Sequence, residues 1–496
     1  MMKLSHDTAV RGEAAGRDGT PCRPLGERSE AVGAPVAAHI AQAASLRSPR
    51  TVRSAIPTTR CGSVLIVVLW ASVGLVSLAL LLGHSMMMTY RGADNDLAGR
   101  QADQAIEGAV RYAESLLVSP TTPGVLPEAT SYQGEAVAVG EAQFWFFGTP
   151  ADTTAGTKGE YGLIDEAAKL NVNTATLAML KALPGMTDDF AAAIIDWRDA
   201  DDDVTPGGAE SSTYAQKRPA YKAKNAPFES IEELALVNGA TREILYGEDA
   251  NLNGVLDPNE DDGEKNLPTD NSDGKLDAGI LAYVTVFSRE PNKQSDGTAR
   301  INISQPGPND ALEKLLNDKL GASRTAEIRA RLGPGGAVRS ALELYVRSGM
   351  KADEFGKIAD ALTVKTGDYL TGLINVNTAG AAVLACVPGI GTDKAATLVT
   401  ARQSRTTQDT NIAWVADALG AEGAVQAGPY LTGQSWQAGA DVAAVGRHGR
   451  GYRRTKFVID TSTGTPRIIY RRNLAPLGWA LGSEVRQSFA MRKETK

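Results

Sequence analysis

The feature that most constrains the fold is an uncharged, mostly apolar run from Ser63 to Met88. As one helix, this run is long enough to cross a bilayer core of about 30 Å. The next segment, Thr89 to Leu117, continues with helix-forming residues, and its apolar members recur at helical spacing. We therefore expect one continuous helix that first spans a membrane and then becomes amphipathic. Such a helix suits packing into a filament better than a simple anchor would.

The charge before this run predicts the orientation of the chain. Arg47, Arg50, Arg53 and Arg60 crowd this segment, and no acidic residue follows Glu30 there. The positive-inside rule then predicts that the N-terminal end stays in the cytoplasm and that the bulk of the chain lies across the membrane.

Composition sets the outer limits. The chain has 496 residues, enough for about three domains, and a net charge of −7, which argues weakly against a polyanionic partner. Two of the three cysteines, Cys22 and Cys61, lie in the N-terminal segment, so we expect no disulfide framework. Cys386 lies in an apolar helical stretch and is predicted to be a buried thiol.

The sequence offers little for catalysis. Of the four histidines, His6 and His39 lie in the N-terminal segment and His84 in the membrane helix, which leaves only His448. No G-x-S-x-G, H-E-x-x-H or Walker A pattern is present. We therefore expect a protein that is not an enzyme.

An internal repeat organises the middle of the chain. Residues 171–198 and 375–402 align without a gap, sharing Asn-Val-Asn-Thr-Ala and Pro-Gly, and a weaker copy spans 301–330. Such similarity predicts one supersecondary unit used again. In each copy we expect a helix capped by Thr174 or Thr378, a tight turn and a second helix, which together resemble a helix-hairpin-helix.

The predicted hairpin turns fit two interpretations. Pro388, Gly389 and Gly391 fit the Pro-Gly-Ile-Gly turn that presents backbone amides to DNA phosphates, whereas Pro184-Gly185 lacks the last glycine. Asp188 and Asp189 follow that first turn and would repel phosphate. In an acidic, exported domain we favour hairpins that serve structure or protein contact over hairpins that read DNA.

Residues 249–260 match the twelve-residue EF-hand calcium loop at every position. The sixth position is Gly254, which permits the sharp turn, and the oxygen set suits Ca²⁺ better than zinc or copper. The alternative is a solvated acidic loop. The predicted ligands are Asp249, Asn251 and Asn253 at positions 1, 3 and 5, the Val255 carbonyl at 7, Asp257 at 9 and bidentate Glu260 at 12. We expect the ion to be structural, because clustered carboxylates repel one another until a cation orders them.

Two partial patterns accompany this loop. A candidate second metal site comprises Asn271, Asp273 and Asp277, but its register puts Thr269 and Ile280 at the two end positions, where ligands are needed. A candidate third metal site has Val204 where the turn glycine should be, so a solvated acidic loop is the favoured interpretation there. Its residues, at the spacing of positions 1, 3, 5 and 12, are Asp199, Asp201, Asp203 and Glu210.

Strand patterns appear before and after the repeats. Residues 142–147 and 280–287 are apolar and rich in aromatic or β-branched residues, and the segments 441–445, 453–460 and 467–471 predict an antiparallel sheet near the C-terminus. This end is basic, which is typical of a solvated sheet face or of a patch that meets acidic neighbours. The basic residues are Arg447, Arg450, Arg453, Arg454, Lys456, Arg467, Arg471 and Arg472.

The start of the apolar run resembles the prepilin junction, in which a leader is cut after a glycine and the apolar helix is retained. Here Gly62 would be that glycine and Ser63 the mature, methylated N-terminus. Most pilin-like proteins carry Glu at the fifth mature position, whereas this chain has Val67. The minor pseudopilin K of type II secretion systems departs in the same way, which suits a subunit with none above it. An uncleaved signal anchor is the alternative interpretation of this segment.

Further segments extend the resemblance to the pseudopilin K family over most of the chain from Gly62 to about Leu481. Residues 161–166 leading into 169–175 look like that family's entry into a helical insertion, and residues 196–199 and 228–234 are similar to later parts of it. The resemblance implies an α+β fold, with a long N-terminal helix and a pilin-like antiparallel sheet that holds a large helical insertion. The implied parts are a cleaved leader (1–62), the helix (63–118), the first part of the sheet (119–165), the insertion (166–430), the C-terminal strands (431–482) and a tail (483–496).

The same resemblance implies the function. The chain would be a minor pseudopilin at the tip of the type II secretion pseudopilus, in the bacterial inner membrane with its bulk in the periplasm. It would be processed by prepilin peptidase and would bind other minor pseudopilins mainly through helix packing. The alternative from the hairpins is a membrane-anchored DNA-binding protein of DNA uptake, although the acidic charge makes nucleic acid an unfavoured partner.

Overall fold

The computed structural model describes residues 61–118, 120, 122–148, 161–305, 309–333, 337–405 and 409–494. The expected leader therefore lies outside the described residues except for its last two. Among the described residues, the chain divides into two units, one that ends at Ser77 and one that begins at Leu78.

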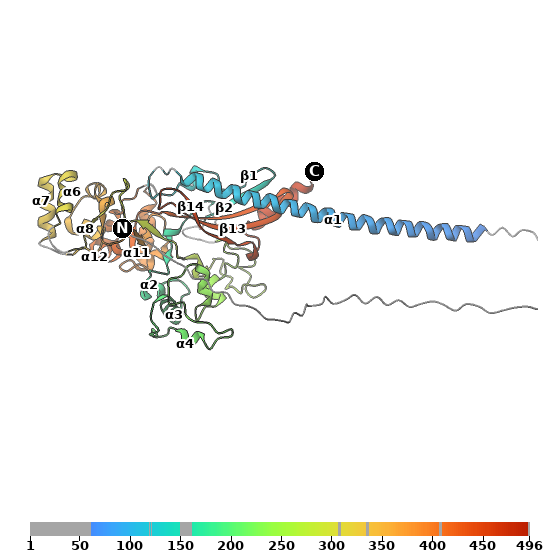
Figure 1. Cartoon of the computed structure of the whole chain (residues 1–496), viewed down its shortest axis with the longest axis horizontal. Coiled ribbons are helices and arrows are strands. Elements are labelled where there is room, and N and C mark those ends of the chain that lie inside the picture. The colour runs from blue at the N-terminus through green and yellow to red at the C-terminus, as the bar shows by residue number, and fades with distance from the viewer. Residues whose placement is uncertain are drawn as a thin grey trace, which may run out of the picture. The chain divides into compact units, whose positions relative to one another are not determined.

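Helix α1 runs from Cys61 to Leu117 (Figure 1, blue). Its apolar side chains in the first unit are exposed, and Trp70 is 78 % exposed. The helix is long and apolar enough to cross a membrane. The expected N-terminal membrane-capable helix is therefore present, and the Gly62–Ser63 bond lies in its first turn.

A six-stranded antiparallel sheet lies in the second unit, and it combines strands from both ends of the chain. Its order is β1–β2–β12–β13–β14, and β3 also pairs with β12. Ala444 of β12 lies opposite Phe144 of β2, so the late strands extend a sheet that begins before residue 148. The bounds are β1 (Val137–Val139), β2 (Ala142–Phe147), β3 (Ile164–Asp165), β12 (Gln437–Gly446), β13 (Arg450–Asp460) and β14 (Arg467–Asn473).

The C-terminal part of α1 packs on this sheet through small side chains. Ala102, Ala105 and Ala109 are fully buried in one cluster with Phe144 and Phe146. Two glycines permit the close approach. A Cβ on Gly446 would lie 2.1 Å from the Ala98 carbonyl oxygen, and one on Gly451 would lie 2.4 Å from the Ala98 carbonyl carbon.

The segment between β3 and β12 contains three related units, each bracketed by a short parallel strand pair. The first pairs β4 (Leu170–Asn171) with β5 (Val284–Thr285), the second β7 (Ile301–Asn302) with β8 (Leu362–Thr363), and the third β10 (Ile374–Asn375) with β11 (Leu431–Thr432). An antiparallel pair, β6 (Arg289–Pro291) with β9 (Tyr369–Thr371), lies outside these brackets.

Helices fill the three units (Figure 1). The first holds α2 (Leu177–Lys181), α3 (Asp188–Arg198), α4 (Ser211–Tyr214) and α5 (Arg242–Tyr246). The second holds α6 (Asp310–Leu320), α7 (Ala322–Leu332), α8 (Ala341–Ser348) and α9 (Ala352–Gly356). The third holds α10 (Ala381–Ala385), α11 (Gly391–Arg402) and α12 (Trp414–Ala427), and α13 (Gly482–Glu494) follows the sheet.

The repeated residues make equivalent contacts in the first and third units. The Oδ1 atoms of Asn171 and Asn375 accept hydrogen bonds from the backbone two residues later, at 2.9 and 3.1 Å. Arg198 donates to the carbonyls of residues 172 and 175, and Arg402 donates to those of residues 376 and 379. Asn302 makes the same turn contact in the second unit, at 2.9 Å. The sequence repeat therefore corresponds to a repeated set of contacts.

Three local predictions were wrong. The segment 280–287 is mostly not a strand, because only Val284–Thr285 pairs and Ile280–Ala282 forms a 3₁₀ turn. The predicted cap Thr174 is not a cap, since α2 begins at Leu177 and Thr176 caps it, while the Thr174 hydroxyl donates to the Asn171 carbonyl at 3.4 Å. In the third unit, Gly380 rather than Thr378 precedes α10.

Candidate metal centre

Side-chain oxygens that accept backbone N–H groups hold residues 249–260 in a tight curve after α5. Asp249 accepts from the Asn253 and Gly254 amides at 3.0 and 2.9 Å. Asn251 accepts from the Asn253 amide at 2.9 Å, and Asn253 accepts from the Val255 amide at 2.8 Å. Gly254 has φ 68°, the left-handed conformation that the sixth position of a calcium loop requires. The oxygens predicted for positions 1, 3 and 5 therefore lie within one turn of chain.

Glu260 closes this loop. One of its oxygens accepts from the Ala250 amide at 3.0 Å and the other from the Asp257 amide at 3.1 Å. The Asp257 carboxylate accepts from the Asn251 and Asn253 side-chain amides at 2.7 and 3.1 Å. The last predicted ligand therefore reaches back to the start of the loop, as a bidentate residue at position 12 would.

The carboxylates of Asp249 and Glu260 are buried, and that of Asp257 is half-buried. Burial raises the pKa of Asp249 to about 6 and also raises the pKa of Asp257. Burial, together with these two carboxylates, raises the pKa of Glu260 to about 8. Among the described residues, no lysine or arginine forms an ion pair with any of the three. A bound cation would supply the missing charge.

The donor set is mixed. Within the described part of the chain, no three His, Cys, Asp or Glu side chains gather closely enough to hold a metal ion by themselves. Amide and carbonyl oxygens from Asn251, Asn253 and Val255 would have to complete the coordination. Ca²⁺ accepts such a mixture of oxygens, so the residues fit this ion.

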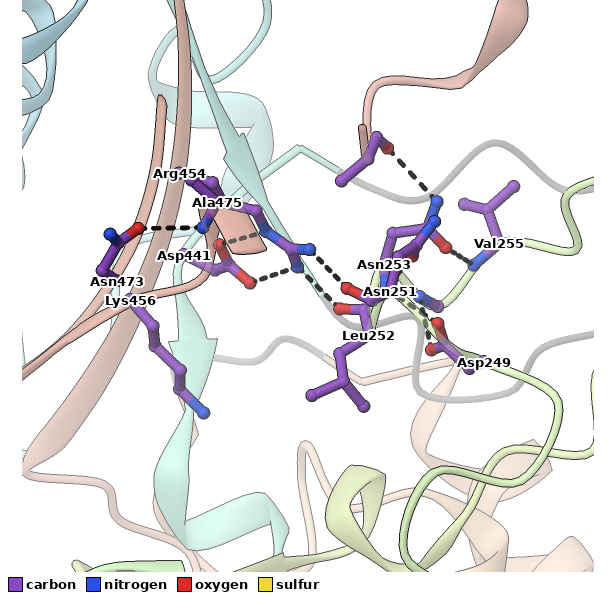
Figure 2. A network of polar contacts seen from close by, with 12 residues as sticks. Asp249, Asn251, Leu252, Asn253, Val255, Asp441, Arg454, Lys456, Asn473 and Ala475 are labelled. Carbon is purple, nitrogen blue, oxygen red and sulfur yellow. Dashed lines mark hydrogen bonds and ion pairs between the residues drawn. The ribbon is translucent and has the colours of Figure 1, made fainter. Parts of the chain in front are cut away.

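A buried arginine of the sheet binds the loop at residues 249–260 through hydrogen bonds (Figure 2). Arg454 of β13 donates to the Asn251 and Leu252 carbonyls at 2.5 and 2.7 Å. The same guanidinium binds both oxygens of Asp441 on β12, at 2.9 and 2.7 Å. The Asn253 side-chain amide also donates to the Ala480 carbonyl at 3.2 Å. The sequence predicted neither this contact nor the burial of Arg454.

The second candidate site repeats part of this geometry. Asn271 accepts from the Asp273 amide at 2.9 Å and donates to Asp277 at 3.0 Å. Ile280, at the predicted last position, is fully buried in the core and cannot be a ligand. Glu248 instead accepts from the amides of 271 and 277, at 3.2 and 2.9 Å, and Asp261 accepts from the amide of 274 at 3.1 Å. Glu248 and Asp261, which lie on either side of the first loop, thus take the places of the two end residues of the second loop.

The third candidate site is assembled only in part. Asp201 and Asp203 are exposed, whereas Glu210 is buried. Asp196 and Asp199 are the charges that contribute most to the raised pKa of Glu210 after burial itself. The pattern missed Asp196 because it lies within α3.

The predicted hairpin turns have a structural explanation. A Cβ on Gly389 would lie 2.6 Å from the Gln426 Cβ and 2.9 Å from the Gly423 carbonyl oxygen of α12. Gly389, Gly185 and Gly391 all have positive φ. Packing against α12 therefore accounts for Gly389, and no observation on the described residues favours a DNA-binding role.

The basic C-terminal residues are mostly paired inside the chain. Arg467 alone of the eight has no ion pair among the described residues. The others pair as Arg447 and Arg450 with Asp94, Arg453 with Asp103, Arg454 with Asp441, Lys456 with Glu166, Arg471 with Glu107 and Arg472 with Glu232. The expected patch for acidic neighbours is therefore largely neutralised by the chain's own acids, several of them on α1.

One comparison with known families agrees with the motif-based resemblance. A family model described as type II secretion system (T2SS), protein K, matches residues 163–246. A solved structure titled as the GspK-GspI-GspJ complex from the enterotoxigenic Escherichia coli type 2 secretion system contains a similar chain. The two chains are 12 % identical with a TM-score of 0.37, and the match covers 75 % of this chain and 96 % of that one. Among curated proteins no match is found.

Proposed function

Residues 163–246 carry the type II secretion system protein K match, and on this premise we propose that the chain is a minor pseudopilin of such a system. The matched segment begins at β3, which pairs with β12 of the sheet, and continues through α2 to α5. It therefore covers the entry into the helical units. The protein acts by assembly, without catalysis.

Two features support a position at the tip of the pseudopilus as part of this proposal. Val67 replaces the acid that would pair with the terminal amine of a neighbouring subunit, so this chain needs no such neighbour. The helical units between β3 and β12 add far more bulk than a hairpin between two sheet strands would. Such a subunit ends a filament more readily than it repeats within one.

The partners in this proposal are other minor pseudopilins in the inner membrane. Full-length chain with a C-terminal tag, crosslinked in membranes of its source bacterium, should recover minor pseudopilins with at most traces of the major one. A variant with Leu78→Lys, which places a charge in the apolar run, should recover fewer. Recovery of the major pseudopilin in large excess would contradict a tip position.

The proposal includes structural Ca²⁺ at residues 249–260. Asp249, Asn251, Asn253, Asp257 and Glu260 would hold it together with the Val255 carbonyl, and Ca²⁺ would neutralise the buried carboxylates. Binding free energy then becomes folding free energy. A second ion at Asn271, Asp273 and Asp277 is part of the same proposal, with Glu248 and Asp261 at the ends.

Thermal unfolding of the full-length protein tests the ion. Millimolar Ca²⁺ should raise the unfolding temperature above that in EGTA, and Glu260→Gln should lose most of this rise, because it removes the bidentate ligand. Glu327→Gln, the same change at an exposed position on α7, is the control. Equal Ca²⁺ effects on both variants would refute this site.

A further inference from the structure

The turn that joins β12 to β13 lies near the end of the apolar run, which belongs to the same compact unit as the sheet. This turn is the 3₁₀ helix η7 (Arg447–Gly449), and both Arg447 and the following Arg450 bind the Asp94 carboxylate of α1. Asp94 lies six residues after Met88, which along an α-helix is about 9 Å. Among the described side chains of α1, Asp94 is the first that the rest of the chain partly shields. The turn is therefore where the folded body first meets α1.

Close packing holds this turn against two helices. The Arg447 amide donates to the side-chain oxygen of Gln101 on α1 at 3.2 Å. A Cβ on Gly449 would lie 2.6 Å from the Cβ of Phe489 on α13. Between these contacts, His448 has φ 57°, a conformation that is uncommon outside glycine, and its side chain is exposed. The turn is thus fixed by its neighbours while its outer side stays accessible.

Positive charge exceeds negative charge at this level of the molecule, although the whole chain has a net charge of −7. The single carboxylate of Asp94 serves two arginines, whose side chains are 31 % and 33 % exposed. Arg91 and Asp96 are both exposed on α1 and offset one another in charge. Tyr90 is 74 % exposed, and tyrosine and arginine at the end of an apolar helix are typical anchors at a membrane–water interface.

We propose that residues 447–450, together with Arg91, bind the anionic headgroups of the bilayer that α1 enters. The headgroup layer extends about 5–8 Å beyond the hydrocarbon core, so a turn about 9 Å along α1 lies at its outer edge. Long arginine side chains bridge such a gap, and anionic lipid attracts them. The contact seats the folded body on the membrane before assembly. This inference rests on the membrane position in the proposed function.

Hydrogen exchange in lipid nanodiscs tests the contact. Full-length protein is inserted into discs of phosphatidylcholine alone and into discs that also contain phosphatidylglycerol. Amides of residues 447–451 should exchange about fivefold more slowly in the anionic discs, the effect expected of one basic side chain near anionic lipid. High salt should remove the difference because it screens surface charge. Helices α6 and α7 should exchange equally in both discs.

His448→Asp and His448→Asn form a matched pair of variants. Both residues tolerate a positive φ, both leave the two arginines on Asp94 in place, and only His448→Asp adds a negative charge. His448→Asp should lose most of the difference between the discs, whereas His448→Asn should keep it. Equal loss in both variants would mean that charge does not cause the contact, which would overturn the proposal.

The remaining outcomes separate this contact from the proposed function. A chain that enters both discs but exchanges equally in them would overturn the contact and leave the proposed function standing. A chain that enters neither disc would contradict the membrane span, and with it both proposals. Equal slowing by inorganic phosphate added to the neutral discs would indicate a site for free anions and would overturn the lipid contact.

Discussion

At the scale of single residues, buried charged side chains stabilise the junction between the sheet and the helical units. Glu166 lies 3.6 Å from the amino groups of both Lys169 and Lys456 and accepts from the Thr285 hydroxyl at 2.5 Å. One carboxylate therefore serves two cations. Its neighbour Asp165 accepts from Asn375, Thr378 and Ser435, which ties the entry of the helical segment to its exit.

The shared carboxylate predicts a pH dependence. Burial, only partly opposed by Glu166, lowers the pKa of Lys169 to about 8 from its ordinary 10.5. Between these values the unfolded chain binds more protons than the folded chain, so folding stability should rise as pH increases from 8 to 10. We expect the unfolding temperature to rise by roughly 2 °C over this range.

Lys169→Met is the matched test, because methionine keeps the length of the stem and removes the charge. Its unfolding temperature, followed by circular dichroism, should change less between pH 8 and 10 than that of the wild type. Identical pH slopes for the two proteins would show that Lys169 does not cause the effect.

Sequence patterns located some residues of the candidate site and missed others for a physical reason. Asp249 to Glu260 are contiguous, so their spacing alone predicted the curve that the structure shows. The burial of Arg454 could not be predicted in this way, because strand alternation shows which residues share a face but not what covers that face.

At the scale of elements, the loop at 249–260 and the strands β12 and β13 form one connected network. Arg454 links the loop carbonyls to Asp441, and its guanidinium lies 5.1 Å from the ring centre of Phe147 on β2. The loop, the strand pair β12–β13 and strand β2, which are far apart in sequence, thus meet at the Arg454 side chain. A more ordered loop should therefore stabilise these strands, and more stable strands should in turn order the loop.

Removing Arg454 should uncouple these elements. Arg454→Met leaves buried Asp441 unpaired and should destabilise the protein by about 3–5 kcal/mol in chemical unfolding. The double variant with Asp441→Leu should recover much of that loss, because an apolar pair can replace a buried ion pair. It should not restore the loop contacts, so amide exchange of residues 249–255 should stay fast in both.

Arg467→Met is the control, since Arg467 lies exposed on β14. Its stability and loop exchange should equal those of the wild type. Slow loop exchange in the double variant would mean that Arg454 does not hold the loop.

Predictions of helices and strands were correct where a long stretch of sequence repeats. They were wrong where a few local contacts determine the structure. The first and third helical units followed from a gapless repeat whose residues make the same contacts in both. The predicted strand at 280–287 failed because Ile280 turns into the core, so only two residues pair with β4. Thr176 rather than Thr174 is the cap because α2 begins at Leu177, so Thr176 directly precedes the helix and its hydroxyl accepts from the Met179 amide.

At the scale of the whole molecule, the chain order explains how one sequence combines a membrane-capable helix with an antiparallel sheet. The second part of α1 packs on strands from both ends of the chain, and all helical units lie between β3 and β12. Acids on α1, including Asp94, Asp103 and Glu107, pair with arginines of the C-terminal part. From Leu78 onward, the helix and the sheet therefore belong to one compact unit.

The most direct test of the account is the N-terminus of the mature protein. The full chain is expressed with a prepilin peptidase, and the intact mass of the purified product is measured, with an inactive peptidase as the control. The account predicts a chain that begins at Ser63 and carries an N-methyl group, and Gly62→Leu should keep the leader. An intact leader with active peptidase, or a cut beyond Met88, would contradict the pseudopilin assignment.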